Sequence, residues 1–241
     1  LRDRLRLGVN LIFPLMLVVG LGNVLRPTLG KATGLDAVTV AFTGVLAATM
    51  FQSTAAGMIS LVEDRETDFS RELFVAPVSR FVLVGGKLLG ETLVAATQGA
   101  LVVLIALPFG IHITGAGLAL AAGPLLLCCL VGGAFGLATI AALPNQRSAM
   151  QIFQFLIIPQ YVLGGVLVPV QTLPVYLAVV AAISPLRYGV DLARSAFYAG
   201  SPHYRQAVTL GPWIDVVVLA GLLTALLVAG VALFEYRERS R

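Results

Sequence analysis

The chain has 241 residues, of which 58% are hydrophobic and only 12% are charged. Soluble domains carry about 25% charged residues, so this composition excludes a water-soluble fold and indicates one integral membrane domain over residues 1–241, surrounded by membrane lipid. The net charge of +4 is spread along the chain and forms no basic patch, so it does not indicate a nucleic-acid partner.

Six stretches are apolar and long enough to cross a bilayer as helices, which takes about 20 residues. In chain order they are residues 7–25, 38–62, 81–109, 116–143, 149–168 and 213–234. A seventh apolar run, residues 173–183, is too short to span and predicts an interfacial or re-entrant helix. Pro212 and Trp213 are typical of a last span that begins at a membrane interface.

The basic residues predict the orientation of these spans, because lysine and arginine concentrate in cytoplasmic flanks. With six spans both termini lie on one side. That side would carry Arg2, Arg4, Arg6, Arg65, Arg71, Arg80, Lys87, Arg147, Arg237, Arg239 and Arg241. The other side would carry Arg26, Lys31, Arg187, Arg194 and Arg205. We therefore expect both termini in the cytoplasm.

Small residues in the spans predict closely packed helices. Gly132 and Gly136 form a GxxxG pair, and several alanines lie along residues 47–56. Such positions let helix backbones approach each other. The pattern fits packing within one bundle, and it also fits a seam between two copies of the chain.

Ionisable residues are scarce inside the spans, although a proton pump or secondary transporter needs them there. Glu91 follows Lys87 by one helical turn, so the two are expected to form an ion pair near the cytoplasmic surface. Asp215 lies at the outer edge of the last span, and neither acid predicts a proton relay. Neutral polar side chains at depth, which include Gln52, Gln98 and Gln160, are either helix–helix contacts or a possible substrate path.

No arrangement of residues indicates catalysis or a metal site. His112 and His203 are isolated, and the adjacent Cys128 and Cys129 fit packing inside an apolar run. "GGKLLG" resembles a phosphate-binding loop, but Phe81 and Leu88 stand where that loop needs glycine and serine or threonine. We expect no enzyme activity and no cofactor in this chain, so energy for transport would come from another one.

The densest run of charges lies between the second and third spans, at "EDRETDFSRELFVAPVSR", residues 63–80. Asp64 or Thr67 can cap a short helix, Pro77 would end it, and Ser79 can cap the next. Phe69 and Leu73 would share one apolar face of this helix. It would suit either docking into a groove of a partner or a solvated loop that fixes topology.

The segment before the last span also has a mixed character. Leu186, Val190, Ala193 and Phe197 form an apolar stripe, whereas Arg187, Asp191 and Arg194 share another face at pairing distance. Together with residues 173–183 this segment predicts a helical hairpin broken at Ser184-Pro185. Charges at membrane depth require partners, so we expect Asp191 to pair with the two arginines. A plain amphipathic interfacial helix is the alternative.

Two stretches resemble the permeases of ABC-2 type transporters. "EDRETDFSRELFVAPVSRFVLVGGKLLGE", from Glu63 to Glu91, is similar to the family's segment between its second and third spans. "LGGVLVPVQTLPVYLAVVAAISPLRYGVDLARSAFY", from Leu163 to Tyr198, resembles its Gly-Val-x-x-Pro, Leu-Pro, Pro-Leu-x-Tyr and Asp-x-x-Arg pattern. The resemblance extends over essentially the whole chain.

The resemblance implies the roles of particular residues. A coupling helix between spans two and three would contact an ATP-binding cassette subunit, which binds ATP and magnesium. Its contacts would be Glu63, Asp64, Arg65, Glu66, Arg71, Glu72, Leu73, Phe74 and Pro77. A re-entrant hairpin between spans five and six would close the outer end. Its residues would be Pro169, Pro174, Pro185, Arg187, Tyr188, Asp191 and Arg194.

The resemblance further implies two permease chains, identical or different, in a bacterial plasma membrane. They would export a drug-like molecule, a lipid or a lipid-linked glycan. A secondary transporter is an alternative, but it predicts internal repeats and a buried carboxylate, neither of which is evident in the sequence. A membrane anchor or sensor subunit that binds an ATPase is a second alternative, and it predicts no substrate path.

Overall fold

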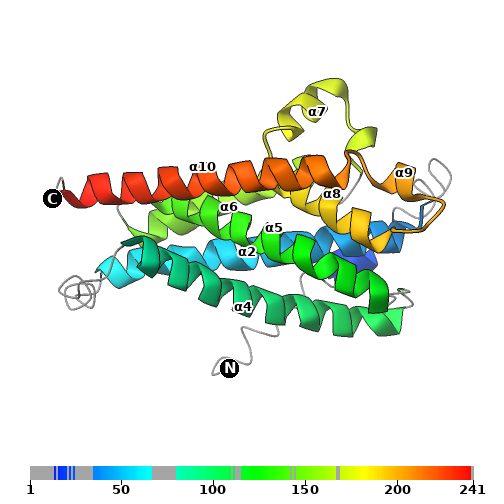
Figure 1. The fold of residues 1–241 in the computed structure, drawn as a ribbon, viewed down its shortest axis with the longest axis horizontal. Coiled ribbons are helices and arrows are strands. Elements are labelled where there is room, and N and C mark those ends of the chain that lie inside the picture. Colours follow the sequence, from blue (N-terminus) through cyan, green and yellow to red (C-terminus); the bar gives the residue numbers. More distant parts are fainter. Residues whose placement is uncertain are drawn as a thin grey trace.

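The computed structural model of the chain describes residues 14, 16–20, 22, 24, 35–66, 80–109, 111, 115–141, 143, 145–166 and 169–239. Within these ranges all regular structure is helical and no strand occurs. The longer helices are α2 (Ala37–Glu66), α4 (Arg80–Ala106), α5 (Gly115–Ala141), α6 (Gln146–Leu163) and α10 (Pro212–Arg239). The shorter elements are η1 (Leu107–Phe109), η2 (Val170–Thr172), α7 (Val175–Ala181), α8 (Pro185–Phe197) and α9 (Tyr204–Ala207). The longer helices run side by side along the longest axis, which confirms an all-helical architecture (Figure 1).

Four segments of the described chain are long and apolar enough to cross a membrane, at Ala37–Leu61, Val82–Ala106, Gly115–Ala141 and Tyr204–Leu233. The bent pair α7 and α8 makes a fifth if it counts as one broken span. Three of the four follow expected spans closely, and the fourth also takes in the residues just before α10. The first expected span, residues 7–25, lies mostly outside the described residues, although residues 16–20 are helical.

The fifth expected span is shorter than residues 149–168. The helix α6 ends at Leu163 because Gly165 has a φ of 69°, a conformation that glycine adopts without steric cost. The amides of Gly165 and Val166 donate to the carbonyls of Val162 and Tyr161, which are the paired bonds of a Schellman turn. The helix has 18 residues, five of them glutamine or arginine, and is not among those apolar enough to span alone. Pro159 lies inside it without ending it.

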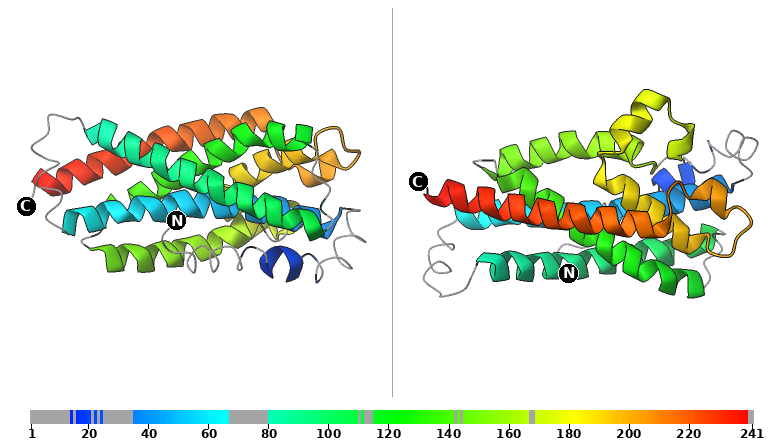
Figure 2. Two further views of the ribbon diagram at one scale, coloured as in Figure 1. Left: turned by 90° about the horizontal axis from the view of Figure 1, so that it is seen from below. Right: turned by 45° about the horizontal axis from the view of Figure 1, so that its top comes forward.

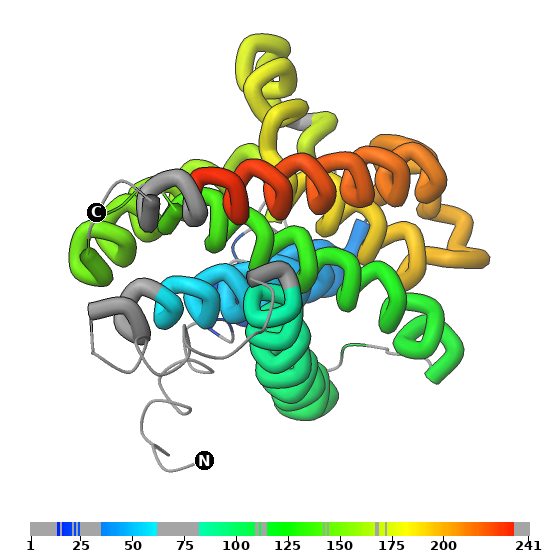
Figure 3. Tube along the Cα trace, turned by 60° about the vertical axis from the view of Figure 1, so that its left-hand side comes forward, coloured from blue at the N-terminus to red at the C-terminus, as the bar shows by residue number. Residues whose placement is uncertain are grey.

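The helix α2 forms the centre of the bundle. The helices α4, α5, α6 and α8 all pack against it (Figure 3). Its large side chains Phe42, Leu46, Phe51 and Met58 are fully buried. The helices α4 and α6 lie on opposite sides of α2 (Figure 2). A continuous apolar core thus extends along α2.

Close contact between α2 and α5 depends on the GxxxG pair. A Cβ atom at Gly132 would overlap the carbonyl oxygen of Phe51, and one at Gly136 would overlap that of Ala55. Both glycines are buried within the chain. The prediction of packing within one bundle is therefore confirmed, and a seam between copies at these two positions is wrong.

The predicted ion pair on α4 is confirmed. The Nζ atom of Lys87 lies 3.1 Å from Oε1 of Glu91, one turn further along the helix. The Glu91 side chain fits against Gly57 of α2, where a Cβ atom would overlap its carboxylate. A glycine at position 57 therefore makes room for a charged side chain between the two helices.

The end of α2 differs from the expectation for the charged block. The helix continues to Glu66, so Asp64 lies inside α2 and is not the cap of a new helix. The next described helix, α4, begins at Arg80, directly after the expected cap Ser79. Thr67, Ser79 and the residues between them lie outside the described residues.

Candidate functional site

The hairpin formed by α7 and α8 is the clearest irregular feature of the bundle. The two helices are bent by 92° at residues 182–184. Pro185 occupies the first turn of α8, where its missing amide costs no hydrogen bond. The helix α7 projects from the side of the bundle, whereas α8 lies within it (Figure 1). The predicted break at Ser184-Pro185 is therefore confirmed.

Two side chains of α8 hold the bend. The hydroxyl of Tyr188 donates to the carbonyl oxygen of Ala182 at 2.7 Å. The Nη1 atom of Arg187 donates to the carbonyl oxygen of Ala178 at 3.3 Å. Both acceptors are backbone groups at or near the end of α7. The Ala178 carbonyl also accepts the amide of Ala182, so α8 adds a second donor there and a donor at Ala182 itself.

Nearly every residue of α8 is buried, including the charged Asp191 and Arg194. The helix packs against α2, α5 and α10, which cover its polar and its apolar face. The alternative of an amphipathic helix lying on the membrane surface is therefore wrong. A helix of mixed polarity inside the bundle needs a partner for each of its charged groups.

Asp191 finds its partners in the backbone before α10. Its carboxylate accepts hydrogen bonds from the amide of Thr209 at 2.8 and 3.1 Å and from the amide of Leu210 at 2.7 Å. Among the described residues no ion pair within 4.0 Å joins Asp191 to Arg187 or Arg194. The expected pairing is wrong because Asp191, Arg187 and Arg194 form hydrogen bonds with backbone groups from other parts of the chain instead.

Arg194 connects three parts of the chain. Its Nη2 atom donates to the carbonyl oxygen of Gly165 at 2.7 Å and to that of Val40 at 3.3 Å. The first acceptor belongs to the turn after α6 and the second to the first turn of α2. Gly44 lies against Val166 at the same junction, where a Cβ atom would overlap the Val166 carbonyl. This junction therefore fixes α6, α2 and α8 relative to one another.

Tyr198 follows α8 on the Arg194 side of the bundle. Its hydroxyl is buried and has no hydrogen-bond partner among the residues that the structure describes. This burial raises the pKa of Tyr198 to about 12. The neighbouring Phe197 packs edge-on against Phe42 of α2, with ring centroids 5.7 Å apart.

The three prolines expected at the outer gate occupy the ends of its elements. Pro169 precedes η2 and is buried, whereas Pro174 precedes α7 and is exposed. Pro185 begins α8 and is buried. Each proline thus lies at a helix start, which is the position that its fixed φ favours.

The glutamines proposed to line a path do not form one group. Oε1 of Gln52 on α2 accepts a hydrogen bond of 2.8 Å from the hydroxyl of Tyr161 on α6. Gln160, the residue before Tyr161, is buried, and its Oε1 atom has no hydrogen-bond partner in the described part of the chain. Gln98 is half-buried on α4, on the other side of α2.

The candidate coupling residues are only partly described. Glu63, Asp64, Arg65 and Glu66 form the last turn of α2. The remaining members of the set lie outside the described residues. They are Arg71, Glu72, Leu73, Phe74 and Pro77.

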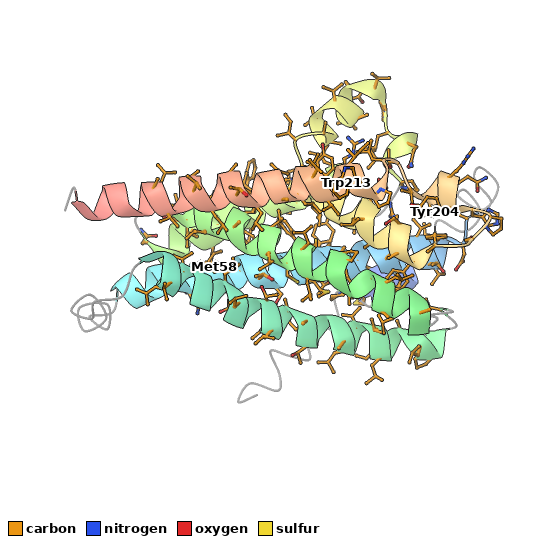
Figure 4. All side chains as sticks on the ribbon, viewed as in Figure 1. Met58, Tyr204 and Trp213 are labelled. Carbon is orange, nitrogen blue, oxygen red and sulfur yellow. The ribbon has the colours of Figure 1, made fainter. Side chains whose placement is uncertain are left out.

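The start of α10 is as expected from Pro212 and Trp213. The helix begins at Pro212, and the Trp213 side chain, labelled in Figure 4, is 76% exposed. Tyrosine and tryptophan favour the membrane interface because they combine an apolar ring with a polar tip. Two residues further, however, Asp215 is fully buried.

Sequence reasoning missed the acceptors of Arg194 and the burial of Asp215. The Gly-Gly pair at residues 164–165 indicated a turn in which backbone carbonyls are free to accept hydrogen bonds. Asp215 was notable as the one acidic residue in an otherwise apolar stretch. Neither feature predicts which residue it interacts with, because Arg194 and Asp191, the interacting residues, lie at least 24 positions away in sequence.

Together, the helices long enough to cross a bilayer and the buried, bent hairpin define a polytopic membrane protein with irregular structure inside its bundle. The sequence matches the ABC-2 type transporter family over residues 1–198, and the chain belongs to this family. Members of this family are membrane components of transporters and are not enzymes themselves; they normally work with an ATP-binding subunit. A comparison with curated proteins found no match.

Proposed function

We propose that this chain is the permease subunit of an ATP-driven exporter. The observation that carries the proposal is family membership over residues 1–198. In this function a separate ATP-binding cassette subunit hydrolyses ATP, and a second permease chain completes the pathway. Binding of ATP in the partner would drive a change between two arrangements of the permease helices.

The charged block would form the docking surface for the ATP-binding subunit. The helix α2 ends in four consecutive charged residues, 63–66, and α4 starts with Arg80. The excess of lysine and arginine on this side supports a cytoplasmic location in a bacterial plasma membrane, with six spans and both termini inside. The α7–α8 hairpin would then close the outer end.

The cargo would be a lipophilic or amphipathic molecule, such as a drug-like compound, a lipid or a lipid-linked glycan. The described parts of the four candidate spans contain one ion pair, Lys87–Glu91, and carry mostly apolar or neutral polar side chains. Such side chains provide few ligands for a free ion, which needs a shell of polar ligands when it leaves water.

The test is purification of the tagged chain in mild detergent, with mass spectrometry of the proteins that accompany it. We expect a stoichiometric ATP-binding subunit that is lost when residues 66–74 are scrambled. A matched control scrambles residues 199–206 at the α9 end of the bundle and should retain the subunit. A well-folded preparation without an ATP-binding subunit would overturn the proposal.

A further inference from the structure

Asp215 is a buried carboxyl group without a hydrogen-bond donor in the described part of the chain. Its side chain is fully buried in the first turn of α10, and neither of its oxygen atoms has a hydrogen-bond partner in the described structure. An ionised carboxylate in such surroundings is strongly unfavourable, because no hydrogen bond replaces those it made to water. The position therefore needs a ligand that removes or balances the charge.

A second carboxyl group lies close to Asp215. Asp191 of α8 lies next to Asp215, and it is held there by the amides of Thr209 and Leu210, just before α10. Two ionised carboxylates repel each other and cannot form a hydrogen bond. One proton between them turns repulsion into a hydrogen bond that joins α8 to α10.

A metal ion fits this place less well than a proton. Both oxygens of Asp191 already accept amide hydrogen bonds, and a cation such as Ca²⁺ requires six to eight oxygen ligands. No group of three or more potential metal ligands occurs in the part of the chain described. The guanidinium of Arg187 also lies near Asp215 and would repel a metal cation.

Among the described residues, the other helices that pack mainly against α10, which are α5 and α4, bring no further net charge near Asp215. The helix α5 carries no charged residue, and its titratable groups are the thiols Cys128 and Cys129. Cys128 contacts the carbonyl oxygen of Ala47. On α4, Lys87 and Glu91 neutralise each other. Arg187 and Asp191 of α8 are thus the charged groups that decide the state of Asp215.

We propose that Asp215 and Asp191 form a proton-binding site that locks α10 to the re-entrant hairpin. With the proton bound, the carboxyl of Asp215 donates to Asp191. When the proton leaves, Asp191 repels Asp215, and Arg187 attracts it. The guanidinium of Arg187 holds the carbonyl oxygen of Ala178 on α7, so loss of the proton weakens the bend between α7 and α8. The contact between Asp215 and Asp191 therefore stabilises the fold while the site is protonated, and this stabilisation is lost as the pH rises.

The test uses the full-length chain in detergent or lipid discs and records its thermal unfolding midpoint from about pH 5 to about pH 9. We expect the midpoint of the unmodified chain to fall by about 5 °C as the pH rises. Asp215→Asn should keep the low-pH midpoint over the whole range, because its amide donates to Asp191 at every pH. Asp36→Asn, a control at an exposed helix cap, should fall like the unmodified chain.

A second measurement does not depend on the variant folding. The infrared C=O band of a protonated carboxyl should be present in the unmodified chain at low pH and disappear as the pH rises. Its absence at every pH would overturn the proposal. So would an Asp215→Asn protein whose midpoint still falls with pH, or a midpoint that rises with added Na⁺ or Ca²⁺ only while Asp215 is present.

Discussion

Arg194 links three helices through one end of its guanidinium group. The Nη2 atom donates to the carbonyls of Gly165 and Val40, and the side chain is almost completely buried. A charged donor to a carbonyl contributes more than a neutral one, because the charge strengthens the bond. The arginine thus supplies a donor to a carbonyl of the Schellman turn, which lies beyond the end of α6.

Replacement of this arginine should loosen the junction. We expect Arg194→Leu to lower the free energy of unfolding by about 1–3 kcal/mol, since the Gly165 carbonyl loses its donor in a buried place, whereas the Val40 carbonyl keeps the Thr43 hydroxyl. Thermal unfolding in detergent measures the change. Arg205→Leu is the control, because Arg205 is exposed on α9 and should shift stability by less than about 0.5 kcal/mol. Equal effects of the two substitutions would contradict this role of Arg194.

The bond between Tyr161 and Gln52 permits a similar experiment at the α2–α6 contact. Tyr161→Phe removes only the hydroxyl that donates to Gln52, so we expect a loss of about 1 kcal/mol in unfolding free energy. Tyr176→Phe on α7 is the matched control, because that side chain is 69% exposed. If both variants unfold at the same temperature as the unmodified chain, the bond contributes nothing to stability.

At the scale of helices, backbone contact between α2 and α5 holds the centre of the bundle. Gly132 and Gly136 bring the α5 backbone against the carbonyls of Phe51 and Ala55. Van der Waals contact and weak Cα–H···O bonds stabilise such seams in the absence of a hydrophobic driving force. Any side chain at these positions must push the helices apart.

Alanine substitutions at two glycines of α5 should distinguish the effect of helix–helix contact from the effect of helix propensity. Gly132→Ala places a methyl group against the Phe51 carbonyl, and we expect a loss of about 1–3 kcal/mol. Gly123→Ala lies in the same helix with no atom within 4 Å of the new Cβ, so it should be neutral or stabilise by up to about 1 kcal/mol. Thermal unfolding of the two variants in one detergent gives the comparison. A stabilised Gly132→Ala protein would show that the seam has room.

At the scale of the whole molecule, the two ends of the bundle differ in character. One end carries the charged last turn of α2 and the start of α4, and the other carries the bent hairpin and α9 (Figure 1). The core around α2 connects them continuously. A change at the charged end can therefore reach the hairpin through packed helices, provided that these have two arrangements.

Charge reversal at the first end tests the proposed coupling. Glu66→Lys together with Glu72→Lys should abolish ATP-dependent export while membrane insertion stays intact, because the docking surface changes sign. Transport into inverted vesicles and the ATPase rate of the complex are the measurements. Glu235→Lys, near the end of α10 on the same side, is the control and should retain transport. Full activity of the double variant would contradict the coupling role.

The sequence by itself determined that the protein lies in lipid and that its long apolar segments are helices. So few charges on so many apolar residues require lipid, and in lipid the backbone must bond to itself, which makes each long apolar run a helix. The break at Ser184-Pro185 and the Lys87–Glu91 ion pair were also predictable. Both depend only on residues close in sequence, through the fixed φ of proline and the one-turn spacing of a helix.

Only the tertiary structure decided where the polar side chains find partners. Arg187, Asp191 and Arg194 are correctly spaced to pair with one another, yet each bonds to backbone groups elsewhere in the chain. Asp191 reaches amides 18 and 19 residues away, and Arg194 reaches carbonyls 29 and 154 residues away. A buried charge takes the donors or acceptors that helix packing brings to it, and that packing depends on the whole bundle.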